Sequence, residues 1–497
     1  MRLFQIVQSL WKRRRWLVPH LLRYPFQKSD LVFGPGPIHV LFLIVDHFEP
    51  IYGNVYPERQ LKRVEEWRIR YPQTIQGFKD CEGKSPQYTW FYFGEDEEHL
   101  KRLSELCFMD LGEIELHIHH GWEDLIPYFW KKWTPEGFVD LIEKQKELFS
   151  EFGALITAED PPKKTFGFIH GMFATENSFC CGLMGELEIL RSLGCYADFT
   201  FPAPGRTQSP LINCHYFPQG DSRQYPSYFK GEVLKKGTLR NDKLLIFQGP
   251  IGYYRKGFRF SFEDGLLAAE QPLTRERIQF WVSRRIHVPG RPDWIFVKVY
   301  THGTMEGNQD YLLGECLPKL HTYLQEYCHS ASPYVLHYVT AREAYNIAMA
   351  AAAGGQGDPG RYRDYLIPPY ANRYISSDLP YRLERYSPKA WSLTIIRPGK
   401  TTLQVKGDIP IILKGDYIVR SDMVWQEEGQ LTLQIEGKDQ VEGRITLPKP
   451  DPFRASPKVL EGEFEVLKWD GDGQMFFKGL YSSQGMLKIN WKLGESN

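Results

Sequence analysis

The sequence lacks the features that define several large protein classes. Its eight cysteines include no C-x-x-C pair and follow no regular spacing, which argues against a cysteine-bound structural zinc and against a disulfide scaffold. Its 61 basic and 61 acidic residues cancel, so no general attraction to nucleic acid is expected. No run approaches the ~20 apolar residues that span a bilayer. No Gly-rich dinucleotide or phosphate fingerprint follows any strand-like segment.

The amino-terminal segment also lacks the order of a signal peptide. An apolar stretch over residues 3–11 precedes the basic run Lys12–Arg15, whereas a signal peptide carries its charges first. A basic arm flanked by tryptophan either packs on its own domain, which is the more frequent case, or lies on a membrane surface. We therefore expect a cytoplasmic protein, with peripheral membrane contact through residues 1–36 as the alternative, and no obligate protein partner.

Short apolar segments alternate with segments of helical periodicity over most of the chain. Strands are expected at residues 39–45, 88–93, 114–118, 165–169, 196–200, 294–299 and 334–339. Helices are expected at residues 57–71, 96–107, 134–152, 182–193, 274–283 and 309–327. This alternation predicts parallel strands with crossover helices. Because nucleotide-binding fingerprints are missing, it favours an α/β barrel over a doubly wound sheet.

Composition divides the chain into four predicted segments. The arm, residues 1–36, precedes a barrel over residues 37–350, which carries an aromatic, Gly-rich insert at about 214–262. Residues 351–390 are predicted to be a linker rich in Gly, Tyr, Arg and Pro. Over residues 391–497, alternating strands separated by Gly-Asp, Glu-Gly and Asp-Gly turns predict an all-β, sandwich-like domain.

Histidines collect at the ends of the predicted strands. In the run that begins at Glu113, strict alternation places Glu115, His117 and His119 on one face of a strand. Seven of the 14 histidines lie in or end such strands, namely His47, His117, His119, His120, His170, His302 and His337. Histidine is the commonest protein ligand for zinc and similar ions. Because α/β barrels carry their active sites where the strands end, the pattern predicts a divalent-metal site there.

Several of these residues also have a purely structural interpretation. His337 lies within a strand and is expected to be a hydrogen-bonded core histidine. His170, before a glycine, serves either a turn or the site, and Asp198 either caps the chain or bonds within the barrel mouth. Asp46 is harder to explain structurally, because a charge directly after the apolar run 40–45 needs a partner if it is buried.

These motifs resemble those of the glycoside hydrolase/deacetylase superfamily, and most of all a divergent branch of the polysaccharide deacetylases with the NodB-like fold. Asp46-His47 matches the acidic pair that ends the first strand of that family, and the run 117–120 matches its histidine motif. The segment 198–202 is similar to its Pro-containing substrate loop. Thr301-His302-Gly303 is similar to its late histidine motif.

The resemblance covers residues 37–350 and implies an α/β fold built as a distorted (β/α)7-type barrel, followed here by the C-terminal all-β domain. Two departures stand out. The second acid of the pair is His47, and Gly121 occupies the position of the family's second metal histidine. No clear counterpart of the family's Arg motif precedes the Pro-containing loop. The superfamily is therefore better supported than the reaction.

The resemblance further implies metal-dependent removal of an N-acetyl group from an amino sugar in a polysaccharide or glycan precursor. A divalent metal, most simply zinc, is expected on metal ligands drawn from His47, His117, His119 and His120. Asp46 is expected to act as general base and His302 as the acid that protonates the leaving amine. The residues expected to contact the carbohydrate are His170, Asp198 and Trp122.

Two other functions fit the same sequence. A glycoside hydrolase would use two carboxylates, drawn from Asp46, Asp198 and Glu176, on the same barrel. A non-catalytic carbohydrate-binding protein would keep the fold without the reaction, although such a module has no need of a metal-activated water. Metal content separates the first function from these two.

Overall fold

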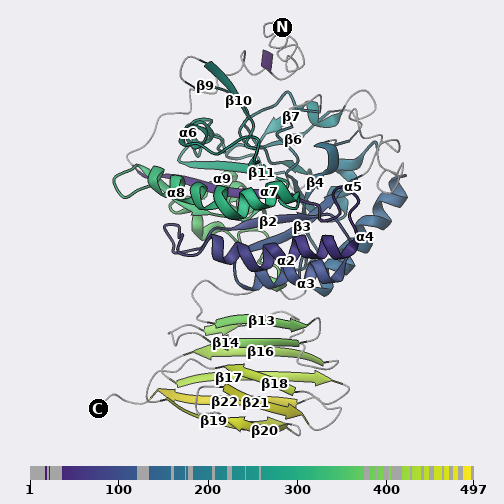
Figure 1. Cartoon of the computed structure of the whole chain (residues 1–497), viewed down its shortest axis with the longest axis vertical. Helices are drawn as coiled ribbons and strands as arrows, with labels where there is room; N and C mark the ends of the chain where they lie inside the picture. The colour runs from purple at the N-terminus through teal and green to yellow at the C-terminus, as the bar shows by residue number, and fades with distance from the viewer. Residues whose placement is uncertain are drawn as a thin grey trace. The chain divides into compact units, whose positions relative to one another are not determined.

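The computed structural model describes most of the chain between residues 36 and 373 and the strands that follow. The described residues are 17–18, 22, 36–119, 134–157, 162–173, 175–176, 183–203, 207–220, 226–240, 242–256, 259–373, 381–387, 390–395, 402–404, 417–425, 428–437, 442–446, 453–461, 464–469, 474–479 and 485–493. Two compact units are present (Figure 1). The first comprises residues 1–96, 112–148 and 165–367, and the second comprises 97–111, 149–164 and 368–497.

The first unit is built on one large sheet with the hydrogen-bonded order β11-β1-β2-β3-β4-β5-β8-β6-β7, and β12 pairs with the first half of β1. The ladders from β11 across to β8 are parallel, whereas β6 and β7 run antiparallel at one edge. The strands are β1 Ile38–Phe48, β2 Tyr88–Tyr92, β3 Gly112–Ile118, β4 Phe166–His170, β5 Cys195–Asp198, β6 Tyr216–Pro218, β7 Gly231–Val233, β8 Leu245–Ile246, β11 Trp294–Thr301 and β12 Tyr334–Tyr338.

All seven strands predicted for the barrel are present, but the sheet is a curled half-barrel. Within the described residues no ladder joins β11 to the far edge of the sheet, so no closed (β/α)7-type barrel is seen there. The predicted mixed α/β fold with parallel strands is confirmed. Strand β8 was not predicted from the sequence, because its two residues lie inside the segment assigned to the insert. The separate hairpin of β9 (Gly252–Lys256) and β10 (Arg259–Glu263) also begins in that segment and ends at its boundary.

Helices that follow the strands cover the convex face of the sheet. Helix α2 (Pro57–Thr74) places Trp67 and Tyr71 against Tyr88, with ring centroids 4.8 and 5.3 Å apart. The π-helical turn η4 (Leu312–Cys316) joins α7 to α8. The other helices of this unit, apart from α9, are α4 Pro135–Glu151, α5 Glu186–Ser192, α6 Arg275–Ser283, α7 Glu306–Tyr311 and α8 Leu317–Tyr327.

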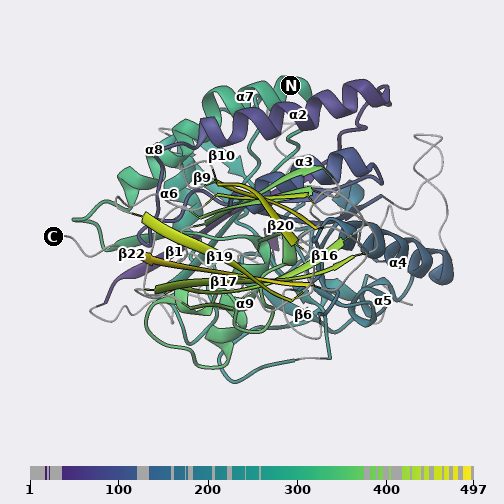
Figure 2. The ribbon, with the colours of Figure 1, turned by 90° about the horizontal axis from the view of Figure 1, so that it is seen from below.

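Helix α9 (Ala341–Ala352) lies on the opposite, concave face (Figure 2). Its first backbone N–H donates to Thr89 Oγ1 of β2 at 3.0 Å, and Arg342 Nε donates to Glu113 Oε1 of β3 at 2.9 Å. Thr89 alternates with Tyr88, whose ring faces α2, so the two helices bury opposite faces of β2. The helix is rich in alanine, and these small side chains let it enter the same core as Leu41 and Leu43.

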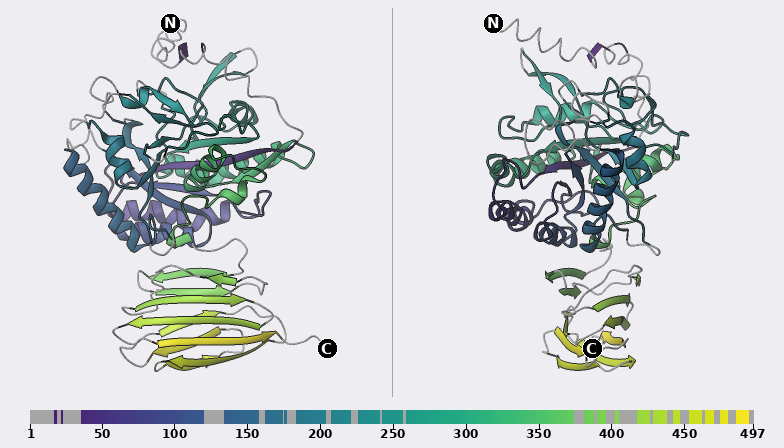
Figure 3. Two further views of the ribbon diagram at one scale, coloured as in Figure 1. Left: turned by 180° about the vertical axis from the view of Figure 1, so that it is seen from behind. Right: turned by 90° about the vertical axis from the view of Figure 1, so that its right-hand side faces the viewer.

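The second unit contains the C-terminal strands, which form two five-stranded sheets (Figure 3). Their orders are β13-β14-β18-β21-β20 and β15-β16-β17-β22-β19. The strands are β13 Tyr381–Ser387, β14 Ala390–Ile395, β15 Thr402–Gln404, β16 Tyr417–Trp425, β17 Glu428–Gly437, β18 Glu442–Thr446, β19 Phe453–Glu461, β20 Phe464–Trp469, β21 Gln474–Gly479 and β22 Gly485–Leu493. Helix α3 (Glu97–Phe108) belongs to this unit as well.

Most of the amino-terminal arm falls outside the described residues, so its contact with a membrane surface stays a prediction. Among the helices that the structure describes, none has the length and apolar character needed to cross a membrane.

Candidate metal centre

Three parallel strands end at one edge of the sheet and bring four histidines and one glutamate together. His47 lies near the end of β1, and Glu49 is the first residue after that strand. His117 and His119 come from the end of β3, and His302 follows β11. The donors form two overlapping groups that share Glu49. These groups are His47, Glu49 and His302, and Glu49, His117 and His119; the donor atoms within each lie within 4.8 Å of one another.

Strand register explains why His47 and His302 meet. Asp46 of β1 pairs with Thr301 of β11, so the next residue of each strand projects from the same face of the sheet. The two imidazoles stack with ring centroids 4.6 Å apart and an interplanar angle of 27°. His117 approaches His47 edge-on at 5.0 Å.

Glu49 is the centre of the cluster. Its Oε1 lies 3.0 Å from His117 Nε2 and 3.3 Å from His119 Nε2, and these two nitrogens are 3.1 Å apart. His117 Nδ1 lies 2.8 Å from the carbonyl oxygen of Ile169, which only accepts, so Nδ1 carries the proton of the neutral ring. Its Nε2 lone pair then faces the Glu49 carboxylate. Two acceptors at this distance are stable when a cation lies between them, so the donor set fits a metal ion.

The pKa shifts in the cluster favour the protonation states in which histidine and glutamate bind a metal ion. Burial, together with the neighbouring His302, holds the pKa of His47 well below its usual value. Burial lowers the pKa of His117 to about 4 and also lowers that of His302. Burial alone would raise the pKa of Glu49, but His119 and His117 lower it well below its usual range. Near pH 7 the imidazoles of His47, His117 and His302 are therefore neutral and Glu49 is a carboxylate, the forms that bind zinc-type ions.

Aromatic rings wall the cluster on two sides. Phe93 lies 4.8 Å from His119, and Phe173 lies 5.0 Å from His47, both measured between ring centroids. Phe173 and the preceding Met172 both have positive φ angles, of 52° and 57°, so the turn after β4 holds Phe173 in an unfavourable backbone conformation. His47 is buried in this setting, whereas His119 is only partly buried.

Two glycines leave room for side chains at the edge of the cluster. A Cβ on Gly171 would lie 2.5 Å from Cγ of His119, and a Cβ on Gly303 would lie 2.2 Å from Oδ2 of Asp46. Any side chain at either position would therefore displace a group at the edge of the cluster. In the His-Gly pairs at 170–171 and 302–303, the second residue is therefore glycine for a steric reason.

The structure does not bring Asp46 into the cluster. It alternates with His47 along β1 and points to the opposite face, where it is fully buried. Its Oδ1 accepts from the Gly303 N–H at 2.7 Å and its Oδ2 from the Tyr88 hydroxyl at 2.8 Å. Burial raises the pKa of Asp46 to about 7. Its observed contacts hold the backbone beside His302, and its role as general base stays a prediction.

His170 and Asp198, predicted to contact substrate, also face away from the histidine cluster. His170 pairs with Ile118 across the β3–β4 ladder, on the face opposite His117. Its Nε2 lies 3.2 Å from Glu186 Oε1, and although burial would lower the pKa of His170, this carboxylate raises it. Asp198 Oδ1 accepts from the Thr200 N–H at 2.8 Å, and burial raises the pKa of Asp198 to about 6.

The remaining sequence predictions are His120 and Trp122, which lie outside the described residues. Glu49 was not predicted, although the sequence carries its signal. It follows His47 by two residues, so alternation alone places the two side chains on one face of the extended chain.

Comparison with known proteins adds little to this geometry. No family model matches the chain, and no curated protein matches it in sequence. Among solved structures, the chain is similar to an Anoxybacillus α-amylase described as providing insight into a new glycosyl hydrolase subclass, at 8% identity and a TM-score of 0.21. The match covers 92% of this chain and 98% of the amylase chain. A TM-score of this size carries no argument, so the assignment of function rests on the site.

Proposed function

We propose that the chain is a divalent-metal-dependent hydrolase whose active site is the cluster of His47, Glu49, His117, His119 and His302. The observation that supports this most strongly is the short approach of Glu49 Oε1 to the Nε2 atoms of His117, which is fully buried, and His119. Buried acceptors that face one another are costly unless a cation or proton lies between them. The low pKa of His117 argues for the cation.

His47, His117 and His119 would hold the ion, with Glu49 as the carboxylate ligand. When bound, a zinc-type ion supplies a Lewis acid that polarises a carbonyl oxygen and acidifies water. Because His117 is fixed by its bond to the Ile169 carbonyl, its Nε2 keeps one direction, as metal-binding histidines normally require.

His302 is the residue that we assign to proton transfer. Burial lowers its pKa, so its imidazole is neutral near pH 7 and accepts a proton. It is only partly buried, unlike His47 on which it stacks, and so it can reach a substrate. In amide hydrolysis His302 would take a proton from the attacking water as the C–O bond forms. It would return that proton to the leaving nitrogen as the C–N bond breaks.

The substrate that we propose is an N-acetylated amino sugar in a polysaccharide or glycan precursor. Support comes from the resemblance of Asp46-His47, the histidine run at 117–120 and Thr301-His302-Gly303 to the polysaccharide deacetylases. The reaction releases acetate and leaves a free amine on the sugar. Trp122 remains a proposed stacking residue for the sugar ring.

The test combines metal content with acetate release from N-acetylglucosamine oligomers. Wild type, loaded with zinc and then desalted, is expected to release acetate, and His117→Ala is expected to lose turnover together with bound metal at this cluster. The matched control is His321→Asn, because His321 is also a fully buried histidine but bonds Tyr338 on the convex face. If His117→Ala keeps both its metal and its activity, the proposal fails.

A glycoside hydrolase with paired carboxylates is the competing function. Two of its candidates, Asp46 and Asp198, are fully buried and bonded to the backbone beside them. Cleavage of glycosidic bonds that persists after chelation of all metal would favour this function over the one proposed.

A further inference from the structure

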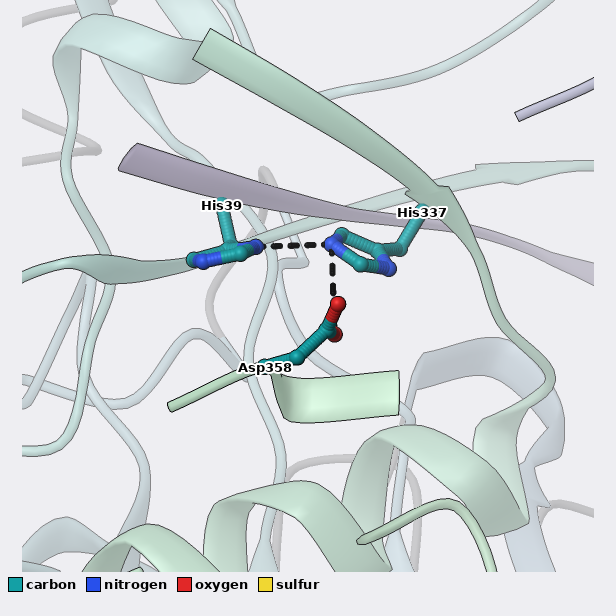
Figure 4. A group of neighbouring side chains, drawn as sticks. All are labelled: His39, His337 and Asp358. Carbon is teal, nitrogen blue, oxygen red and sulfur yellow. Dashed lines mark hydrogen bonds and ion pairs between the residues drawn. The ribbon is translucent and has the colours of Figure 1, made fainter. Parts of the chain in front are cut away.

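A second group of metal-ligating side chains lies at the other end of β1. His39 is the second residue of that strand, His337 lies on the adjacent β12, and Asp358 precedes the 3₁₀ turn η5 (Pro359–Tyr362). Their donor atoms all lie within 4.8 Å of one another (Figure 4). His39 and His47 are eight residues apart on one extended strand, which places the two groups about 26 Å apart.

We propose that His39, His337 and Asp358 bind a second divalent cation of the zinc type, independent of the cation at the catalytic cluster. His39 Nδ1 lies 2.8 Å from His337 Nε2, and Asp358 Oδ1 lies 4.0 Å from the same nitrogen. Figure 4 shows the two imidazole nitrogens and the carboxylate directed toward one another. Two imidazoles and a carboxylate form a common donor set for zinc, with one position left for solvent.

A carboxylate behind His337 sets the direction of its lone pair. Glu82 Oε2 lies 3.2 Å from His337 Nδ1 and only accepts, so Nδ1 carries the proton and Nε2 points its lone pair at His39 and Asp358. Arg363 Nε donates to the same Glu82 oxygen at 3.2 Å and fixes it. A carboxylate that orients a histidine in this way is the usual outer partner of a metal ligand.

Without an ion, His39 Nδ1 must donate to His337 Nε2, and 2.8 Å is a normal length for that hydrogen bond. Zinc–nitrogen bonds of about 2.0–2.1 Å at tetrahedral angles require the two nitrogens to be roughly 3.3 Å apart. The two rings would therefore separate by about 0.5 Å on binding. The Asp358 side chain is 44% exposed, which leaves it able to close on the ion.

The ligands join elements that are far apart in sequence. β1 pairs with β11, β12 and β2, and Asp358 follows α9, the helix on the concave face. An ion here would fasten the segment after α9 to the sheet, and it would stabilise the folded state in proportion to its affinity. We therefore assign this second site to stability rather than to turnover.

The test uses the full chain in the His117→Ala background, which removes a ligand of the proposed catalytic ion. Zinc held by the remaining group of His47, Glu49 and His302 would be unaffected by changes at Asp358 or His337. His117→Ala is expected to bind one equivalent of zinc and to show a rise in Tm on zinc addition. Adding Asp358→Asn, or His337→Asn, is expected to remove both effects. Asp358→Asn preserves the side-chain oxygen that caps η5 by accepting from the Gly360 N–H, so this variant is expected to fold.

Glu82→Gln provides the graded variant. Loss of the orienting carboxylate is expected to weaken zinc binding in the same background by about 10- to 100-fold, without abolishing it. Asp358→Asn in the wild-type background is expected to lose one zinc equivalent and keep acetate release, which separates this site from the proposed activity. If the His117→Ala protein binds no zinc, or binds it equally after Asp358→Asn and His337→Asn are combined, the inference is overturned.

Discussion

His117 shows how one strand position sets the chemistry of the cluster. It is fully buried, its Nδ1 is committed to a backbone carbonyl, and its Nε2 faces Glu49. The sequence predicted this residue and His47, His119 and His302, because period-two alternation and position at a strand end are local properties. The same alternation also shows that Asp46 and His47 cannot share a face. The resemblance had assigned both to the site, and the geometry separates them.

The lowered pKa values of the cluster predict how metal-free protein responds to acid. For His117 the folded pKa of about 4 lies below the ordinary 6.5, so the unfolded chain binds protons first. Stability is therefore expected to fall as pH drops from 6.5 toward 4. Comparison of urea midpoints near pH 7 and near pH 5 is expected to show a smaller loss for His117→Asn than for wild type. An equal loss in both proteins would contradict the assigned neutral state.

Asp46→Asn distinguishes a positioning role from a catalytic one. The amide oxygen can still accept from the Gly303 N–H, and the amide N–H can donate to Tyr88, so the site geometry should persist. We expect unchanged metal content and turnover within about tenfold of wild type, since no group that reacts is removed. A loss of about 10²–10⁴ in kcat with metal retained would instead make Asp46 the general base.

The raised pKa of Asp46 gives a second readout of the same variant. Its folded pKa of about 7 lies above the ordinary 3.8. Its contribution to the free energy of unfolding is therefore fully present below pH 3.8 and is lost as pH rises to 7. Asp46→Asn is expected to remove this part of the pH dependence of stability. This sign is opposite to that of His117, which allows the two contributions to be separated in the same titration.

Gly171→Ala tests the steric position of His119. The added methyl would lie 2.5 Å from the His119 ring, so the ring must leave its present position beside Glu49. Zinc affinity at the cluster is expected to fall about 10- to 100-fold, as when an orienting contact is lost. The matched control is Gly307→Ala in α7, where a Cβ would meet no described atom within 4 Å. Equal zinc affinities in the two variants would remove His119 from the proposed ligand set.

At the scale of elements, α9 is the part of the fold that the sequence did not place. Strands and helices were predicted within a few residues because their periodicity is local. The prediction could not show that an alanine-rich helix occupies the concave face, since this depends on partners far away in the sequence, such as Thr89 and Glu113. For the same reason it missed the two-residue strand β8 and the open edge of the sheet.

The buried ion pair between Arg342 and Glu113 anchors α9. Both side chains are almost fully buried, and Arg342 Nη1 also donates to the Ile367 carbonyl at 2.7 Å. Arg342→Met leaves the Glu113 carboxylate buried without its cation and is expected to cost about 3–5 kcal/mol. Arg240→Met, which breaks the exposed pair with Asp242, is the control and should change stability by less than about 1 kcal/mol. Similar denaturation midpoints for both variants would show that this pair does not hold α9.

At the scale of the whole molecule, β1 connects two groups of metal-binding side chains. One end carries His47 and Glu49, and the other carries His39, whose neighbour His337 was predicted as a core histidine with a hydrogen bond. That bond is present. The sequence could not reveal Asp358 as a third partner, because Asp358 lies after α9 and is far from His39 in the sequence. The first group serves the proposed hydrolysis and the second the proposed stabilisation.

Crystallography of the zinc-loaded protein at the zinc absorption edge would show whether the strand ends hold a catalytic cation. We expect an anomalous peak among His47, Glu49, His117 and His119, about 2.0–2.2 Å from the ligating nitrogen and oxygen atoms. If crystals of protein that still releases acetate show no anomalous peak at this position, the proposed catalytic cation is contradicted.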